Sequence, residues 1–176
     1  LTLRGTLTAA GVTIENTVVR AAPVETRPPQ QRPLARFFSE GLFIASPVPA
    51  VVYFRLFEFT QADLLLYVSP IQELAISQGD ATPLLREAGG FIGNTYFGRL
   101  LTTEQSLEVM ELLTRQNARQ TLWLAEHMRP ALFIGYIPIC DELGHQFLGR
   151  HEQGDAAATG AMLWGFTIAE RWFEQV

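Results

Sequence analysis

The spacing of hydrophobic residues changes partway along this 176-residue chain, and this change constrains the fold more than any other feature. Over residues 1–20 hydrophobic and polar side chains alternate, which is the period of a β-strand with one buried face. From Thr102 onwards hydrophobic residues recur every three or four positions, which is the period of an α-helix. The first half therefore favours short strands, and the second half favours helices.

The first half predicts several strands. Residues 1–20 should form a hairpin that turns at Ala10 and Gly11, with one strand on each side. Residues 50–59 and 64–68 are apolar, aromatic and β-branched, so each is expected to be a strand. Residues 21–35 contain four prolines and are expected to form a loop or an extended linker.

The second half predicts a long helix over residues 104–128. Thr102 and Gln105 have the spacing of a capping box, which indicates where the helix begins. The helix should end before Pro130, because a residue that precedes proline is disfavoured in the helical conformation.

An uncharged apolar run over residues 131–137 follows this helix. The run fits a parallel strand buried on both faces, with a short buried helix as the alternative. A further helix is expected over residues 155–176. The order helix, strand, helix indicates part of a doubly wound α/β sheet.

The composition excludes several classes of protein. Hydrophobic residues make up 48% of the chain, which excludes a disordered chain. No apolar run approaches the roughly 18 residues of a membrane helix, so no membrane segment is expected. All 13 basic residues are scattered arginines and the net charge is −5, so no nucleic-acid surface is expected. The single cysteine, Cys140, excludes a disulfide framework and a cysteine-rich zinc site.

Residues 136–145 carry the candidate chemistry, with the sequence Tyr-Ile-Pro-Ile-Cys-Asp-Glu-Leu-Gly-His. Asp141 and His145 are four residues apart, so their side chains converge if the segment makes a helical turn. A carboxylate and an imidazole suit Zn²⁺ or Mn²⁺, and Gly144 would allow a tight bend beside the metal. A catalytic zinc needs about three protein ligands, so the others are expected outside this chain.

The pattern Tyr-x-Pro-x-x-Asp-x-x-Gly-His resembles the metal motif of the type I phosphodiesterase/nucleotide pyrophosphatase family, within the alkaline phosphatase superfamily. The resemblance implies that Asp141 and His145 bind one of two divalent metals, usually zinc, with Mn²⁺ as the alternative. It implies a hydrolase of nucleotides or other small phosphodiesters that uses a Thr or Ser nucleophile. No residue here matches that nucleophile, so the chain is expected to be an internal fragment of a longer enzyme, inactive alone and without a catalytic residue of its own.

The same resemblance implies a fold and a domain division. Residues 70–176 would be a fragment of an alkaline-phosphatase-like doubly wound sheet, and residues 1–69 a β-rich lobe inserted in it or capping it. After Phe147 the family continues with Gly-Pro, whereas this chain continues with Leu-Gly-Arg, so the loop that leaves the motif is expected to differ.

Two alternatives to this function stay open. Phosphoglycerate mutases and phosphopentomutases of the same superfamily have similar Asp-x-x-Gly-His spacing, although Tyr136 and Pro138 favour the phosphodiesterases. The other alternative is a non-catalytic β-rich interaction module, in which Asp141 only caps a helical turn. Glu142 and His151 are the candidates for orienting the ligands, with plain exposure to solvent as the alternative role.

Overall fold

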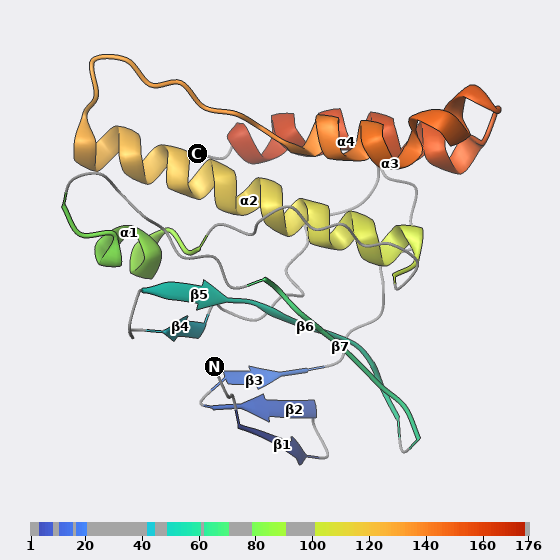
Figure 1. The fold of residues 1–176 in the computed structure, drawn as a ribbon, viewed down its shortest axis with the longest axis horizontal. Coiled ribbons are helices and arrows are strands. Elements are labelled where there is room, and N and C mark those ends of the chain that lie inside the picture. The colour runs from blue at the N-terminus through green and yellow to red at the C-terminus, as the bar shows by residue number, and fades with distance from the viewer. Residues whose placement is uncertain are drawn as a thin grey trace. The chain divides into compact units, whose positions relative to one another are not determined.

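The computed structural model describes residues 4–8, 11–15, 17–20, 42–44, 49–60, 62–70, 79–90 and 101–174. These residues form small antiparallel sheets and four helices, so the protein is of mixed α and β structure (Figure 1). The chain divides into two compact units. The first comprises Leu1–Val24 and Arg36–Tyr96, and the second comprises Glu25–Ala35 and Phe97–Val176. The sequence places the division earlier, between residues 69 and 70.

The first unit begins with a three-stranded antiparallel sheet. The expected hairpin is present, and Thr8 pairs with Gly11 across it. The single strand expected after the hairpin turn is interrupted at Glu15, which has a φ of 48°. The chain reverses there, and the residues that follow pair with the strand that precedes Glu15. The Glu15 backbone N–H donates to the Arg4 carbonyl oxygen at 2.9 Å, which extends the pairing of the first two strands as far as this turn. The strands are β1 (Gly5–Thr8), β2 (Gly11–Ile14) and β3 (Thr17–Val19), in that order.

Two strand pairs follow, and they confirm the strands expected over residues 50–59 and 64–68. Tyr53 separates the first of these regions into two strands, and a bulge between Leu56 and Glu58 shifts the register of the second pair. Both pairs are antiparallel. They consist of β4 (Leu42–Ile44) with β5 (Ala50–Val52), and β6 (Phe54–Phe59) with β7 (Leu64–Val68).

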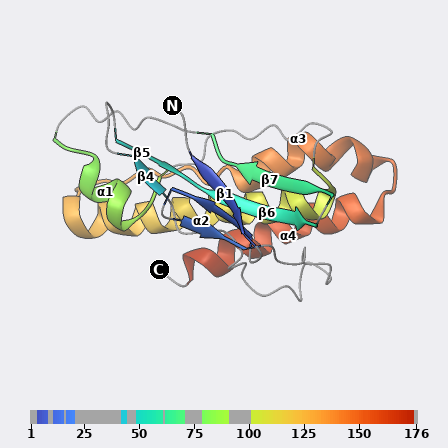
Figure 2. The same cartoon turned by 90° about the horizontal axis from the view of Figure 1, so that it is seen from below.

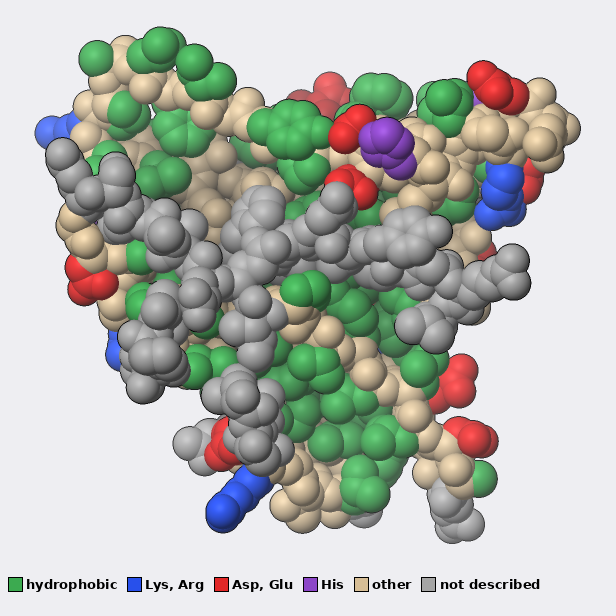
Figure 3. Space-filling model, viewed as in Figure 1, with side chains coloured by type: hydrophobic (Ala, Val, Ile, Leu, Met, Phe, Trp, Pro, Cys, Tyr) green, Lys and Arg blue, Asp and Glu red, His purple; other side chains and the backbone are tan. Residues whose placement is uncertain are grey.

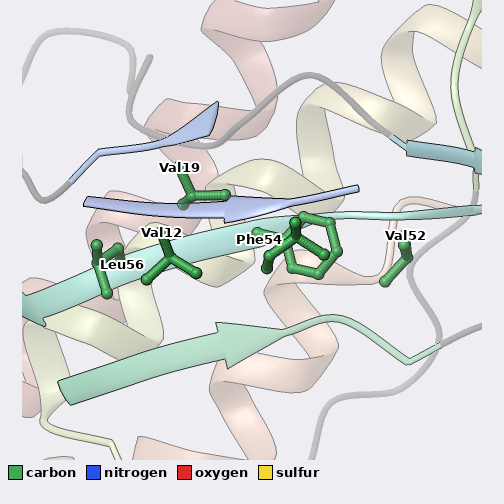
Figure 4. Packing of buried hydrophobic residues seen from close by; sticks show 6 residues of the cluster. Val12, Val19, Val52, Phe54 and Leu56 are labelled. Atoms are coloured by element: carbon green, nitrogen blue, oxygen red, sulfur yellow. The ribbon is translucent and has the colours of Figure 1, made fainter. Parts of the chain in front are cut away.

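The interior of the first unit lies where these sheets meet. Strands β2 and β3 contact β6, and apolar side chains from both sides fill the space between them (Figure 4). β-Branched and aromatic residues suit this position because they pack well on pleated surfaces. The buried cluster comprises Val12, Ile14, Val19, Val52, Phe54 and Leu56.

A short helix, α1 (Thr82–Glu87), ends at two glycines that bring the chain close to β5. Gly89 has a φ of 87°, a conformation that glycine adopts readily. At Gly90 an added Cβ would lie 2.8 Å from the Cβ of Val51, so only glycine fits there without displacement. The Gly90 backbone N–H also donates to the Tyr53 hydroxyl at 3.1 Å.

The described part of the second unit includes α2 (Thr103–Met128), which confirms the expected long helix. Its capping box is formed: the Gln105 N–H donates to the Thr102 hydroxyl at 3.2 Å, and the Thr102 N–H donates to the Gln105 side-chain oxygen at 2.9 Å. The helix ends at Arg129, which has a φ of 44°, directly before Pro130. Both ends of the helix are therefore determined by local sequence.

The strand predicted over residues 131–137 is wrong. This segment forms neither a strand nor a helix, and its side chains are exposed, with Ile134 85% accessible. All strand pairs of the described residues are antiparallel, and none includes this segment. The predicted order of helix, strand and helix is therefore wrong as well. Figure 3 shows hydrophobic side chains at the upper left, where the segment before α3 arches in Figure 1.

Two further helices, α3 (Ile139–Glu152) and α4 (Ala156–Phe173), form an antiparallel hairpin. They lie side by side in two perpendicular views (Figures 1 and 2). Asp155 caps α4 and accepts two hydrogen bonds from Arg150, at 2.9 and 2.6 Å, which fixes the hairpin turn. Gly165 allows the two helices to approach, because a Cβ there would overlap Leu143.

The loop or linker expected over residues 21–35 lies outside the described residues. In the part of the chain that the structure describes, no helix is long and apolar enough to cross a membrane.

Candidate metal centre

Helix α3 has one buried face and one exposed face, and the motif residues divide between them. Ile139, Leu143 and Phe147 recur every fourth residue and are buried. Asp141 and His145 also lie four residues apart, but two positions further along the helix. Since each residue advances about 100° around an α-helix, this offset places them on roughly the opposite side. The apolar positions thus anchor the helix and direct the candidate ligands towards solvent.

The structure brings Asp141 and His145 together, as the sequence predicts. The His145 Nε2 atom lies 3.5 Å from the Asp141 Oδ1 atom, one helical turn away. Both side chains are exposed, His145 to 76% and Asp141 to 56%, so a dissolved ion can reach both. Figure 3 shows a histidine beside acidic side chains on the face over α3.

Two expectations about the surrounding backbone are wrong, because α3 continues through the motif. Gly144 lies inside the helix, so it provides no tight bend. The loop expected to leave the motif after Phe147 is absent, since Leu148, Gly149 and Arg150 are still helical. Helical spacing rather than a loop therefore sets the geometry of the pair.

Tyr136 joins the pair from the segment before the helix. Its hydroxyl donates a hydrogen bond to the Asp141 Oδ2 atom at 2.8 Å. This bond raises the pKa of Tyr136 above its usual value near 10, so the phenol stays protonated and remains a donor at neutral pH. The sequence gives Tyr136 no role beyond its place in the motif. The sequence signal for this contact is a tyrosine two residues before Pro138, the residue that directly precedes α3.

The two exposed ligand atoms suit zinc. A tetrahedral zinc ion with an oxygen and a nitrogen ligand at about 2.0–2.2 Å requires those atoms to be about 3.3–3.5 Å apart. The observed distance of 3.5 Å between Oδ1 and Nε2 meets this requirement without movement of the backbone. Asp141 also lies in the first turn of α3, where the helix dipole favours a negative charge.

The structure does not bring the two candidate orienting residues into this arrangement. Glu142 is half-buried, and no hydrogen bond among the described residues joins its carboxylate to Asp141 or His145. His151 lies six residues beyond His145, about 9 Å along the helix axis. Its Nδ1 atom is 2.7 Å from the Thr159 hydroxyl, so it belongs to the contact between α3 and α4.

Two other residues with reactive side chains, His127 and Cys140, lie outside the candidate pair. His127 stacks on Trp123 in the last turn of α2, with the ring centres 4.2 Å apart, and its Nδ1 atom is 2.9 Å from the Trp123 carbonyl oxygen. Cys140 is half-buried beside Asp141. Burial raises the pKa of its thiol, so it stays protonated at neutral pH and is a poor nucleophile.

The pair is the whole of the candidate centre in the described residues. Within them, no group of three or more histidine, cysteine, aspartate or glutamate side chains is arranged to hold a metal ion. A search of protein-family models, of curated proteins and of solved structures gives no match to this chain. The chemistry of the pair therefore rests on its own geometry.

Proposed function

We propose that this chain is part of a longer, metal-dependent phosphoric diester hydrolase, in which Asp141 and His145 hold one of two divalent metal ions. The observation that supports this most directly is the 3.5 Å separation of Oδ1 and Nε2 on an exposed helix face. The motif that contains them supports the class of reaction, because it resembles that of the type I phosphodiesterases and nucleotide pyrophosphatases.

The residues of this chain would hold and orient the ion. Asp141 offers the Oδ1 atom, and His145 offers the Nε2 atom in its neutral form. A divalent ion in that position would act as a Lewis acid that stabilises negative charge on phosphoryl oxygens. Burial of Ile139 and Leu143 keeps α3 in place, so the two ligands stay one helical turn apart.

The proposal assigns the other parts of the active site to residues outside those described. A catalytic zinc takes about three protein ligands, so the pair needs at least one more. The nucleophile and the ligands of the second ion would also come from residues outside those described. An alkaline-phosphatase-like doubly wound sheet belongs to the same proposal, and the described residues contribute helices but no parallel strand to it.

The test is hydrolysis of bis(p-nitrophenyl) phosphate by the longer protein, with and without a chelator. Asp141→Ala and His145→Ala should each lower the rate by about 100-fold or more, because loss of a ligand should cost at least as much as the roughly 10–100-fold loss typical of a residue that orients one. Glu152→Gln and His127→Ala are the matched controls, because they remove an exposed carboxylate and an exposed imidazole elsewhere. Activity that persists in chelator, or in both ligand variants, would contradict the proposal.

Substrate profiling separates the proposal from an enzyme of the mutase type. A phosphoglycerate-mutase-like or phosphopentomutase-like enzyme of the same superfamily would also need Asp141 and His145. It would move a phosphoryl group within a phosphomonoester and leave the diester intact. Diester hydrolysis that depends on both residues therefore supports the phosphodiesterase assignment.

A non-catalytic β-rich interaction module is the second candidate, and one observation outside its β-rich residues favours a binding role for the chain. Residues 131–137 carry no charge, and in addition to Tyr136 they expose four large aliphatic or aromatic side chains. An apolar surface of this kind commonly marks a contact with another molecule. Folded longer protein that hydrolyses no phosphodiester with any divalent metal would favour this candidate.

A further inference from the structure

The hydrogen bond between Tyr136 and Asp141 makes the two oxygens of this carboxylate unequal. Oδ2 accepts the Tyr136 hydroxyl at 2.8 Å, while Oδ1 lies 3.5 Å from the His145 Nε2 atom. The Tyr136 hydroxyl has a single proton, and it donates this proton to the Oδ2 end of the carboxylate. One oxygen is therefore engaged, and the other is turned towards the second ligand.

We propose that Tyr136 is a positioning residue that makes Asp141 bind a metal ion through the Oδ1 atom alone. This inference rests on the proposed function, because it concerns the same two ligands. It adds a third residue to the site and a preference between metals. Tyr136 itself would not touch the ion.

The advantage of this arrangement is orientation before binding. An exposed aspartate on a helix samples several rotamers, and fixing one of them on binding costs entropy. The bond from Tyr136 holds the rotamer that points Oδ1 towards Nε2. Hydrogen-bonded partners of this kind are common around metal-binding carboxylates, and their removal typically lowers metal affinity by about 10–100-fold.

Engagement of one oxygen also favours small ions over large ones. Zn²⁺ takes a single carboxylate oxygen readily in a tetrahedral site. Ca²⁺ needs six to eight oxygen ligands and often takes both oxygens of one carboxylate. While Tyr136 donates to Oδ2, binding of an ion through both oxygens of Asp141 has to compete with that hydrogen bond. Loss of the hydroxyl would free the second oxygen and would weaken the preference for Zn²⁺ over Ca²⁺.

The experiment is isothermal titration of the 176-residue chain with Zn²⁺, and separately with Ca²⁺. Tyr136→Phe removes only the hydroxyl and keeps the ring. Phe133→Leu is the matched control, because it changes an exposed ring of the same segment that makes no bond to Asp141. Asp141→Ala defines the signal that does not come from the site.

We expect wild type and Phe133→Leu to bind Zn²⁺ alike, and Tyr136→Phe to bind it about 10-fold more weakly or worse. The ratio of Zn²⁺ to Ca²⁺ affinity should fall in Tyr136→Phe as well. Zinc affinity equal in wild type and Tyr136→Phe, but lost in Asp141→Ala, would overturn the role of Tyr136 and leave the metal site standing. Wild type that binds no better than Asp141→Ala would overturn both.

Discussion

The interior of the first unit and the candidate centre in the second unit differ in how far apart in the sequence their contacting residues lie. In the first unit, strands from its beginning pack on strands from its middle, so that Val12 lies beside Leu56 (Figure 4). In the second unit, α3 packs on the helix that follows it, and the candidate centre lies within residues 136–145. Site geometry thus depends on local structure, whereas the β-rich interior depends on distant contacts.

The largest effect that tests this comparison is expected in the β-rich interior. Phe54 is almost fully buried between the sheets, so Phe54→Ala should lower the free energy of unfolding by about 3–5 kcal/mol. Urea denaturation followed by circular dichroism measures the change. Phe166→Ala is the control, because Phe166 is 61% exposed on α4 and its loss should cost about 0.5 kcal/mol or less. Equal losses in the two variants would contradict the described interior.

A pair of glycines sharpens the comparison at the next level. Gly90→Ala places a Cβ against the Cβ of Val51, which cannot move without the backbone, so a loss of about 1–3 kcal/mol is expected. Gly165→Ala brings a Cβ against the Leu143 side chain, whose end can move more easily than a backbone, and alanine favours a helix by about 1 kcal/mol over glycine. The second variant should therefore cost less than Gly90→Ala. A larger loss at Gly165 than at Gly90 would mean that the contact between α3 and α4 is more rigid than the contact between Gly90 and β5.

The capping box of α2 gives a smaller effect that is local in origin. Thr102→Ala removes the acceptor of the Gln105 N–H bond and should cost about 1 kcal/mol in urea denaturation. Thr103→Ala changes the neighbouring threonine and keeps the cap, so it should cost less. A helix that tolerates both substitutions equally would show that its start is set by packing instead.

The smallest effect concerns acid stability at the turn between α3 and α4. Hydrogen bonds from the Ala158 N–H, and then from Arg150, lower the pKa of Asp155. A carboxyl group with a lowered pKa stabilises the folded state above its unfolded pKa near 4, and this contribution is lost as the pH falls through the lower folded value. Asp155→Asn keeps a capping acceptor but cannot titrate. Below about pH 4 the variant should therefore lose less stability than wild type. Identical acid profiles would contradict the assignment.

The features that the sequence predicts correctly are those set by neighbouring residues. Thr102 with Gln105 marks where α2 begins, and Pro130 marks where it ends, because capping and proline sterics act within a few positions. The spacing of Asp141 and His145 predicts their convergence for the same reason. A break such as that at Glu15 carries no comparable signal, since its residue type does not favour a positive φ.

The features that the sequence misses depend on partners elsewhere in the chain. Residues 131–137 have the composition of a buried strand, but an apolar run without alternation does not show whether a neighbouring strand exists. Their exposure was therefore not predictable from the run itself. The bond from Tyr136 to Asp141 was missed because it depends on the path of the chain between Tyr136 and Pro138, before α3 begins.

The central claim is that Asp141 and His145 bind one metal ion together, and X-ray absorption of the zinc-loaded chain tests it most directly. The account predicts one imidazole nitrogen and one carboxylate oxygen at about 2.0–2.2 Å, with water oxygens in the remaining positions. The imidazole signal should disappear in His145→Ala and persist in His127→Ala. An imidazole signal that is unchanged in His145→Ala, or a zinc ion surrounded by oxygen alone in wild type, would contradict it.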